Sequence, residues 1–335
     1  MEFLQVKLKQ KKLLYFTNFI EDFVAFTKMK NQREFLPYEI IFSVTDFCNL
    51  KCKHCYIQKN NKILNVSAAK NFLDTINECK TESEITHIGF SGGEPFLFPD
   101  VIEQIVKKSI EKDLLFDCIM TNGLWWKSLE ELKTVLQKIY DAGFDGKIGI
   151  SIDYYHAQAF SNDFALYFQK LDEFCQSIFD IWQDSSMIKI QTVNYKTENQ
   201  IFNKKKIIQS LPDCFEYEIF CFDESFTSDD ERAWKDKKWF KEDYCFGPGQ
   251  ILYVHSDGRI APCCGFANEN EKLIIGKLNQ TFDEILKNAK NNEMINLCYT
   301  NGLSSKIKEL KKQKLLPKGK TKDNCTFCDF ICNLK

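Results

Sequence analysis

Three cysteines share one short stretch of this 335-residue chain: Cys48, Cys52 and Cys55, with three and then two residues between them. The stretch follows an apolar, strand-like run at residues 39–44. Spacing this close lets three thiolates turn inward on one loop, as soft metals and iron–sulfur clusters require. A four-iron cluster takes four ligands, so three cysteines would leave one iron open to another molecule.

Two simpler interpretations of this loop stay open at this point. Zinc sites more often use two cysteine pairs with a two-residue spacing and four ligands in total, and His54 could supply the fourth ligand on paper. Chance is the other alternative, because 15 cysteines in 335 residues produce some close pairs.

A second motif, Gly92-Gly93-Glu94-Pro95, follows an expected strand at residues 85–91. Two glycines let the backbone approach a ligand closely, and we expect their N–H groups to be available to bind it. A glycine pair is weak evidence by itself. Its position directly after the strand that follows the cysteine loop makes it informative.

Together the two motifs resemble the signature of the radical S-adenosylmethionine (radical SAM) superfamily. The resemblance implies that Cys48, Cys52 and Cys55 hold a [4Fe-4S] cluster, whose open iron binds S-adenosylmethionine. Reductive cleavage of that molecule then gives a 5′-deoxyadenosyl radical. The cofactor contacts that the resemblance implies are His54, Tyr56, Ser91, Gly92, Gly93, Glu94, Asn122, Ser151 and Asp153.

Regular alternation of strand and helix patterns predicts an α/β fold, a partial (β/α)6 TIM-like barrel with a parallel sheet. Ligands of such sheets collect at the carboxyl ends of the strands, where the cysteine loop, Gly93, Asn122, Ser151 and Asp153 all fall. Asp153 could instead be an ordinary helix N-cap, and His156 could contact substrate or only satisfy its loop. The expected strands are residues 39–44, 85–91, 114–120, 147–153, 187–195 and 216–222.

The expected organisation has four parts: a helical extension at residues 1–36, the barrel at 37–222, a polar linker at 223–243 and a small cysteine-rich domain at 244–335. In that last part, Asp257-Gly258 between short apolar runs predicts a β-hairpin. The hairpin would bring Cys245 and Cys263 to the same end of the ribbon.

Four thiolates of this part, from Cys245, Cys263, Cys325 and Cys328, are enough for a second four-iron cluster ligated entirely by protein. Four-cysteine zinc is a rival on spacing alone, and Cys332 could replace one of the ligands. We interpret the remaining cysteines as structural: Cys79, Cys118, Cys175, Cys214, Cys221 and Cys298.

The pattern Gly258-x4-Cys263, with an earlier cysteine and a later Cys-x2-Cys, resembles the twitch domain, a shortened form of the SPASM extension of peptide-modifying radical SAM enzymes. It implies one auxiliary [4Fe-4S] cluster. Within that group the chain is most similar to the epipeptide-type peptide epimerases, which convert L-residues to D-residues. One departure is Gly249-Gln250, where an acidic residue is expected in those enzymes.

Cys264 is the candidate catalytic residue. Adjacent side chains diverge, so if Cys263 is a ligand, Cys264 projects to another face. The resemblance then makes its thiol the donor that returns a hydrogen atom to a carbon-centred radical. The alternatives are that Cys264 is the ligand in place of Cys263, or that it is a small buried apolar residue.

The composition of the chain restricts the kinds of partner that we expect it to bind. A formal net charge of -2 gives no basic field for nucleic acid, and no apolar run reaches the length of a membrane span. No signal peptide is recognisable, so we expect a reduced cytoplasmic protein. The resemblance implies a ribosomally synthesised precursor peptide as substrate and an electron donor such as flavodoxin or ferredoxin.

The predicted function is therefore radical SAM modification of a peptide by L-to-D epimerisation. Peptide cross-linking through a thioether or a carbon–carbon bond is the alternative within the same chemistry. A zinc-stabilised binding protein without catalysis is the alternative from another class, and a radical SAM enzyme acting on a metabolite also stays open.

Overall fold

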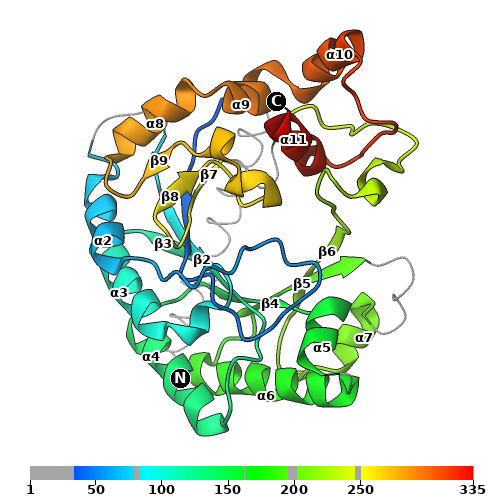
Figure 1. The fold of residues 1–335 in the computed structure, drawn as a ribbon. Helices are drawn as coiled ribbons and strands as arrows, with labels where there is room; N and C mark the ends of the chain where they lie inside the picture. The colour runs from blue at the N-terminus through cyan, green and yellow to red at the C-terminus, as the bar shows by residue number, and fades with distance from the viewer. Residues whose placement is uncertain (1–33, 79–82, 162, 195–201, 246–249, 335) are drawn as a thin grey trace, which may run out of the picture.

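A computed structural model describes residues 34–78, 83–161, 163–194, 202–245 and 250–334, and Figure 1 shows the arrangement of the elements. Six parallel strands follow the chain in order and form one continuous part of the sheet. These strands are β1 (Glu39–Ser43), β2 (His87–Ser91), β3 (Leu115–Thr121), β4 (Lys147–Ser151), β5 (Ile188–Asn194) and β6 (Glu218–Asp223). The helices between them are α2 (Val66–Thr75), α3 (Pro99–Ile110), α4 (Leu129–Asp141), α5 (Tyr154–Phe160), α6 (Phe164–Trp182) and α7 (Lys204–Gln209).

The helices cover the outer face of the curved sheet, as Figure 1 shows. Alternate strand residues such as Ile148, Ile150, Ile188 and Ile190 are fully buried in the core. Parallel strands joined by helical crossovers, curved into an incomplete barrel, confirm the predicted α/β class. Helix α5, which the sequence did not predict, begins directly after Asp153, whose side chain accepts hydrogen bonds from the Tyr155 and His156 amides.

A C-terminal hairpin extends the same sheet beyond β1. Strand β7 (Ile251–Val254) pairs in parallel with β1, β8 (Arg259–Ala261) returns antiparallel, and β9 (Gly276–Lys277) follows at the edge. Gly258 has φ of +85°, which the tight turn requires, so the predicted Asp-Gly hairpin is confirmed. The helices beyond it are α8 (Phe282–Lys290), α9 (Glu293–Ile295), the π-helical turn η5 (Asn296–Asn301), α10 (Leu303–Gln313) and α11 (Asn324–Asn333).

The stretch at residues 223–243, predicted to be a linker, packs closely against α11. The ring centroids of Trp239 and Phe327 lie 5.5 Å apart, and those of Trp234 and Phe330 lie 5.3 Å apart. The Ser228 amide also donates to a carboxylate oxygen of Asp329 at 2.8 Å. The aromatic residues of this stretch are widely spaced among polar ones. Its sequence therefore resembles a linker, although the aromatic side chains pack against α11.

Two further expectations concern the N-terminal extension and a membrane span. The helical extension predicted for residues 1–36 lies almost entirely outside the described residues. Among the helices that are described, none combines the length and the apolar character that crossing a membrane would require.

The inside of the barrel holds a carboxyl group with an unusual environment. Glu39, at the start of β1, is only 6% exposed, and its Oε1 atom has no hydrogen-bond partner among the described residues. A Cβ atom on Gly89 of the neighbouring strand would lie 2.7 Å from that oxygen, so the glycine leaves room for the carboxyl group. Burial first, and then the charge of Asp117, raise the pKa of Glu39 to about 8.

This environment predicts a pH dependence of stability. The pKa of Glu39 is higher in the folded protein than in the unfolded chain, where it is 4.5. Below pH 4.5 this group therefore leaves the free energy of unfolding unchanged. As the pH rises from there towards 8, the free energy of unfolding falls. At about 1.4 kcal/mol per pKa unit, the wild-type protein should lose about 2 kcal/mol from this group between pH 6 and pH 8. Glu39→Gln should abolish that part of the loss. Urea unfolding of both proteins at the two pH values measures the difference, and an identical pH dependence would contradict the assignment.

Candidate functional site

The three cysteines of the first motif line one cavity at the carboxyl ends of the barrel strands. The cavity has a volume of about 260 Å³. Its wall combines the cysteine loop after β1 with residues that end β2, β3 and β4. The predicted site residues that line it are Cys48, Cys52, Cys55, His54, Tyr56, Ser91, Gly92, Gly93, Asn122, Ser151 and Asp153.

An aspartate holds the cysteine loop in a closed turn. The carboxylate of Asp46 accepts hydrogen bonds from the amides of Asn60 (3.0 Å) and Lys62 (2.6 Å) at the far end of the loop. Thr45 adds a hydroxyl bond to the Lys62 carbonyl at 2.8 Å. Side chains at the base of the loop thus fix its ends, which leaves the cysteines between them directed into the cavity.

The glycine pair serves the cysteine loop itself. The Gly93 amide donates to the Thr45 carbonyl and the Glu94 amide to the Phe47 carbonyl, both at 2.7 Å. A Cβ atom would lie 2.3 Å from the Thr45 oxygen at Gly92 and 2.0 Å from the Phe47 oxygen at Gly93. The expectation that the glycine N–H groups are available to a ligand is therefore wrong for Gly93, whose amide binds the loop that carries the cysteines, as the Glu94 amide also does.

Glu94 lies beneath the cavity and is not among the residues that line it. Its fully buried carboxyl group accepts from the Thr121 hydroxyl (2.8 Å), the Asn122 amide (2.8 Å) and the Phe96 amide (3.2 Å). Burial raises its pKa to about 7, although these hydrogen bonds oppose the rise. The geometry thus gives Glu94 a positioning role between β2 and β3.

The sulfur of Cys48 receives two donors from the protein. The Leu50 amide approaches Sγ at 3.4 Å and the Asn122 side-chain amide at 3.7 Å. Asn122 in turn bonds to Asn49 at 2.9 Å, so its orientation is fixed. Donors aimed at a cysteine sulfur stabilise negative charge on it, and this arrangement suits a thiolate bound to an iron–sulfur cluster.

A charged pair forms the opposite wall. Asp153 is only 2% exposed, and its Oδ2 atom lies 2.7 Å from Nδ1 of His156. Burial lowers the pKa of His156, but the charge of Asp153 and hydrogen bonds to Asp153 and Cys52 raise it to about 10. Asp153 is therefore the helix N-cap that the sequence left open, and it also holds a histidine against a cysteine of the loop. His54 stacks on Tyr155 with ring centroids 5.0 Å apart.

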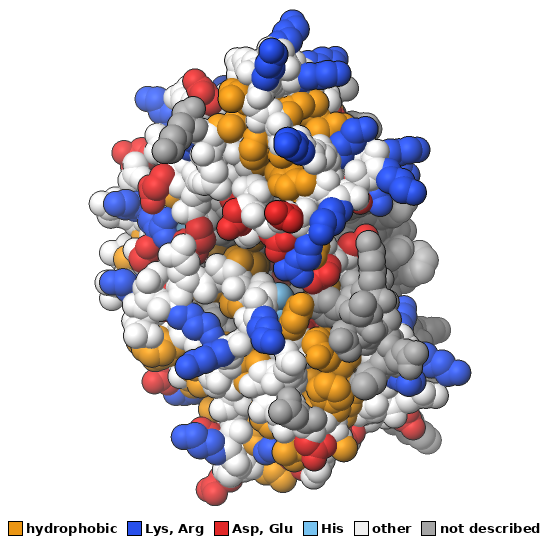
Figure 2. All heavy atoms as spheres, turned by 45° about the vertical axis from the view of Figure 1, so that its right-hand side comes forward, with side chains coloured by type: hydrophobic (Ala, Val, Ile, Leu, Met, Phe, Trp, Pro, Cys, Tyr) orange, Lys and Arg blue, Asp and Glu red, His pale blue; other side chains and the backbone are white. Residues whose placement is uncertain are grey.

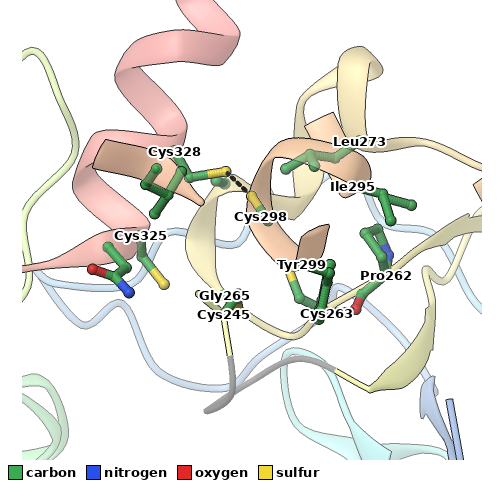
Figure 3. Close-up of a pocket in the computed structure, with 13 residues that line it drawn as sticks. Cys245, Pro262, Cys263, Gly265, Leu273, Ile295, Cys298, Tyr299, Cys325 and Cys328 are labelled. Carbon is green, nitrogen blue, oxygen red and sulfur yellow. Dashed lines mark hydrogen bonds between the residues drawn. The ribbon is translucent and has the colours of Figure 1, made fainter. Parts of the chain in front are cut away.

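A second group of cysteines lines a small apolar cavity in the C-terminal part, shown in Figure 3. Its volume is about 30 Å³. The four predicted ligands, Cys245, Cys263, Cys325 and Cys328, are all brought together there. No disulfide joins any of the described cysteines. Four thiols that converge from three separate segments suit a bound metal cluster.

Sequence reasoning missed one residue of the second cavity. Cys298, which we interpreted as structural, lines this cavity and lies with its Sγ atom 3.9 Å from that of Cys328. It stands alone in the sequence with no second cysteine at metal-ligand spacing, so no local pattern identifies it.

Cys264 lines neither of the two cavities, whereas its neighbour Cys263 lines the second. The hydroxyl of Tyr56, which lines the first cavity, donates to the Cys264 carbonyl at 3.1 Å. Burial, and then the nearby charge of Glu39, raise the pKa of Cys264 to about 12, so its sulfur is a thiol at neutral pH. Cys264 is close enough to Cys325 to raise the pKa of that thiol as well.

The departure at Gln250 has a structural explanation. Gln250 is 2% exposed, and its side-chain nitrogen donates to the Glu34 carbonyl at 2.6 Å. Its side-chain oxygen accepts from the Leu36 amide. The side chain therefore fixes the segment that leads into β1, which occupies both of its polar groups.

Comparison with known families matches both halves of this arrangement. Residues 42–178 match the radical SAM superfamily, and residues 245–329 match SPASM, an iron–sulfur cluster-binding domain. The chain carries a radical SAM domain followed by a SPASM domain. The first match contains all three cysteines of the loop, and the second contains all the cysteines of the second cavity.

The chain is also similar to individual proteins. The chain is 31% identical over 123 residues to the antilisterial bacteriocin subtilosin biosynthesis protein AlbA of Bacillus subtilis, covering 35% of this chain and 25% of that protein. It is 23% identical over 263 residues to the putative peptide biosynthesis protein YydG of Bacillus subtilis, covering 74% and 76%. The structure of Streptococcus suis SuiB bound to precursor peptide SuiA aligns with a TM-score of 0.45 and 13% identity, covering 92% of this chain and 79% of that one.

Several of these matches are partial. The chain covers between 25% and 38% of the length of three of the curated relatives it matches, AlbA among them.

The two domains define the cofactors. A radical SAM domain binds a [4Fe-4S] cluster and S-adenosylmethionine, and a SPASM domain binds auxiliary iron–sulfur clusters. The residues fit both groups, because three cysteines and their hydrogen-bond donors line the first cavity and cysteines surround the second. These matches favour iron–sulfur over the zinc interpretation that spacing alone had left open.

The contact between the glycine pair and the cysteine loop is testable. Gly93→Ala should displace the loop, because the new Cβ would meet the Phe47 carbonyl at 2.0 Å. The loss of the first cluster should lower the iron content by about half after anaerobic reconstitution, since the auxiliary site is untouched. Cys221→Ala is the control, because Cys221 is an exposed cysteine on β6, outside both cavities, and its loss should leave the iron content unchanged. Full iron content in the Gly93 variant would refute the positioning role.

Proposed function

We propose that this protein modifies a ribosomally synthesised peptide, and that the modification is L-to-D epimerisation with Cys264 as the hydrogen donor. The names of two relatives support a peptide substrate, since AlbA is a bacteriocin biosynthesis protein and YydG a putative peptide biosynthesis protein. The match to YydG carries most weight for the whole chain, because it extends over three quarters of both proteins.

One observation carries the finer proposal: the position of Cys264. The Tyr56 hydroxyl ties the backbone of Cys264 to the cysteine loop, while the preceding residue lines the second cavity. A hydrogen donor must reach the substrate from a different side than the group that removes hydrogen. The Cys264 thiol follows β8 of the C-terminal hairpin and so comes from a different segment than the cysteine loop, which is consistent with this requirement.

When bound, the cluster and S-adenosylmethionine supply the 5′-deoxyadenosyl radical that removes an α-hydrogen from the peptide. Cys264 then transfers a hydrogen atom to the α-carbon, so the S–H bond breaks as a C–H bond forms on the opposite face. The sulfur regains its hydrogen by taking up one proton and one electron. We propose a flavodoxin or ferredoxin as the source of that electron, which places the protein in the reducing cytoplasm.

The cavity residues prepare this reaction by binding and orientation. Ser91, Ser151 and the Asn122 side chain offer polar groups at the strand ends, and His54 stacked on Tyr155 offers a flat surface. We assign these to the S-adenosylmethionine site. Asp153 and Glu94 hold their neighbours in place and leave the direct contacts to the other residues.

The surface of the protein offers both charged and apolar contacts to a peptide. On the face shown in Figure 2, acidic and basic side chains lie side by side near the middle of the molecule. Apolar side chains gather above and below them. Such a surface suits a substrate that carries both charged and apolar residues.

Substitution of Cys264 tests the proposal. With the wild-type protein in deuterated buffer, a short precursor peptide sought among the neighbouring reading frames should gain one deuterium at an α-carbon and one D-residue. Cys264→Ala should form less than about 1% of the D-residue while still cleaving S-adenosylmethionine, because the hydrogen donor alone is lost. Chiral amino-acid analysis and mass spectrometry measure both products.

Cys221→Ala is a matched control, since Cys221 is an exposed cysteine on β6. It should retain epimerisation. A product lighter by two hydrogens in the wild-type reaction would indicate cross-linking instead of epimerisation. Unchanged D-residue formation in the Cys264 variant would exclude the thiol as donor.

A further inference from the structure

Helix α10 and the segment after it carry a concentrated positive charge. Eight lysines and one glutamate fall within residues 303–322, in a chain whose formal net charge is -2. Five of these lysines are exposed, and their ammonium groups have no hydrogen-bond or ion-pair partner among the residues that the structure describes. We call these five residues the basic surface: Lys308, Lys311, Lys312, Lys314 and Lys318.

Local structure does not account for this charge. The dipole of α10 favours the two lysines of its last turn, Lys311 and Lys312, but Lys314 and Lys318 lie at and beyond the helix end. Lys308 shares one face of the helix with Lys311 and Lys312, where like charges repel each other. Lys314 also has φ of +57°, in the left-handed region that favours glycine. Local interactions therefore oppose this arrangement of charges, and an anionic partner would offset the repulsion.

A groove next to the basic surface adds apolar contacts. Its volume is about 920 Å³, and residues of α9, η5, α10 and α11 line it. Leu310 and Leu315 are among its apolar residues, and Leu315, which directly follows Lys314, is 50% exposed. Figure 2 shows basic side chains around apolar ones at the top of the molecule, the height at which α10 lies in Figure 1. An apolar centre with a charged rim is the composition expected of a protein–protein interface.

The elements that line the groove also line the second cysteine cavity. In η5, Leu297 lines the groove and its neighbour Cys298 lines the cavity. In α11, Cys328 lines the cavity, and Ile331, about one helical turn later, lines the groove. A protein bound in the groove would therefore lie close to the site of the auxiliary cluster, as electron transfer between the two requires.

We propose that the basic surface and this groove dock an acidic one-electron carrier protein, which reduces the cluster of the second cavity. The carrier loses one electron and the cluster gains it, and no atom is transferred. Opposite charge guides the two proteins together and orients them, as in other weak electron-transfer encounters. The nearness of the cavity favours a redox partner over other anionic molecules. The inference rests on the external electron donor of the proposed function, and it does not depend on epimerisation.

Binding of a flavodoxin of low isoelectric point to the reconstituted full-length protein tests the docking surface. Lys308→Glu/Lys311→Glu should weaken binding about tenfold at low salt, chiefly through slower association, because two attractive charges become repulsive. Lys287→Glu/Lys290→Glu is the matched control, since these are exposed lysines with the same spacing on α8, and it should bind like the wild type. At about 0.5 M salt the difference between the two variants should disappear, because the charges are screened. Surface plasmon resonance measures affinity and association rate.

Electron transfer is measured separately in a background variant with Cys48, Cys52 and Cys55 changed to Ala, which keeps only the auxiliary cluster. Reduced flavodoxin should bleach this cluster in stopped-flow absorbance. The reaction should be about tenfold slower at low salt with Lys308→Glu/Lys311→Glu and unchanged with Lys287→Glu/Lys290→Glu. Lys318→Glu, outside the helix, should slow it in the same direction, so a decision is reached even if the α10 variant does not fold.

Two results would overturn the proposal. One is equal affinity and equal reduction rate in the two double variants, and the other is an auxiliary cluster that reduced flavodoxin does not reduce. Neither measurement uses a peptide. A failure of epimerisation would therefore leave both results unchanged, and a failure of docking would leave the epimerisation proposal standing.

Discussion

Strand β1 is the element on which the rest of the structure depends, because it is paired on both sides. Its Ile40 lies opposite Ile88 of β2 and opposite Leu252 of β7, so the barrel and the C-terminal hairpin share one strand. A slip of one residue in either pairing would turn the fully buried Ile40 and Phe42 towards the barrel interior. This register places the cysteine loop at one end of β1 and Glu39 at the other.

Backbone contacts, more than side chains, attach the cysteine loop to the barrel. The turn after β2 donates two short amide bonds to loop carbonyls, at Thr45 and Phe47, and only glycine allows the chains to approach so closely. The loop is thereby fixed before any cluster binds. A rigid loop needs little reorganisation to ligate iron, and its third cysteine remains exposed to receive it.

Buried charge organises the opposite wall of the cavity. The carboxylate of Asp153 keeps His156 protonated, and that imidazolium lies against Cys52 of the loop. Glu94, beneath the cavity, connects the end of β2 to the end of β3 through two bonds of 2.8 Å. Both carboxyl groups are buried and bonded to protein groups, so the packing around them fixes their positions. Each one stabilises a neighbour that faces the cavity.

The sequence alone determined the chemistry and the class of fold. Cysteine spacing, a glycine pair after a strand and regular strand–helix alternation are local patterns, and each reports the same architecture independently. Only the tertiary structure decided which atoms make the contacts that position the site. It showed that the Gly93 and Glu94 amides bind the loop, that Gln250 fixes the segment before β1, and that Cys298 joins the second cysteine cavity. The physical reason is that such contacts join residues far apart in the chain, and their direction depends on packing that no local spacing encodes.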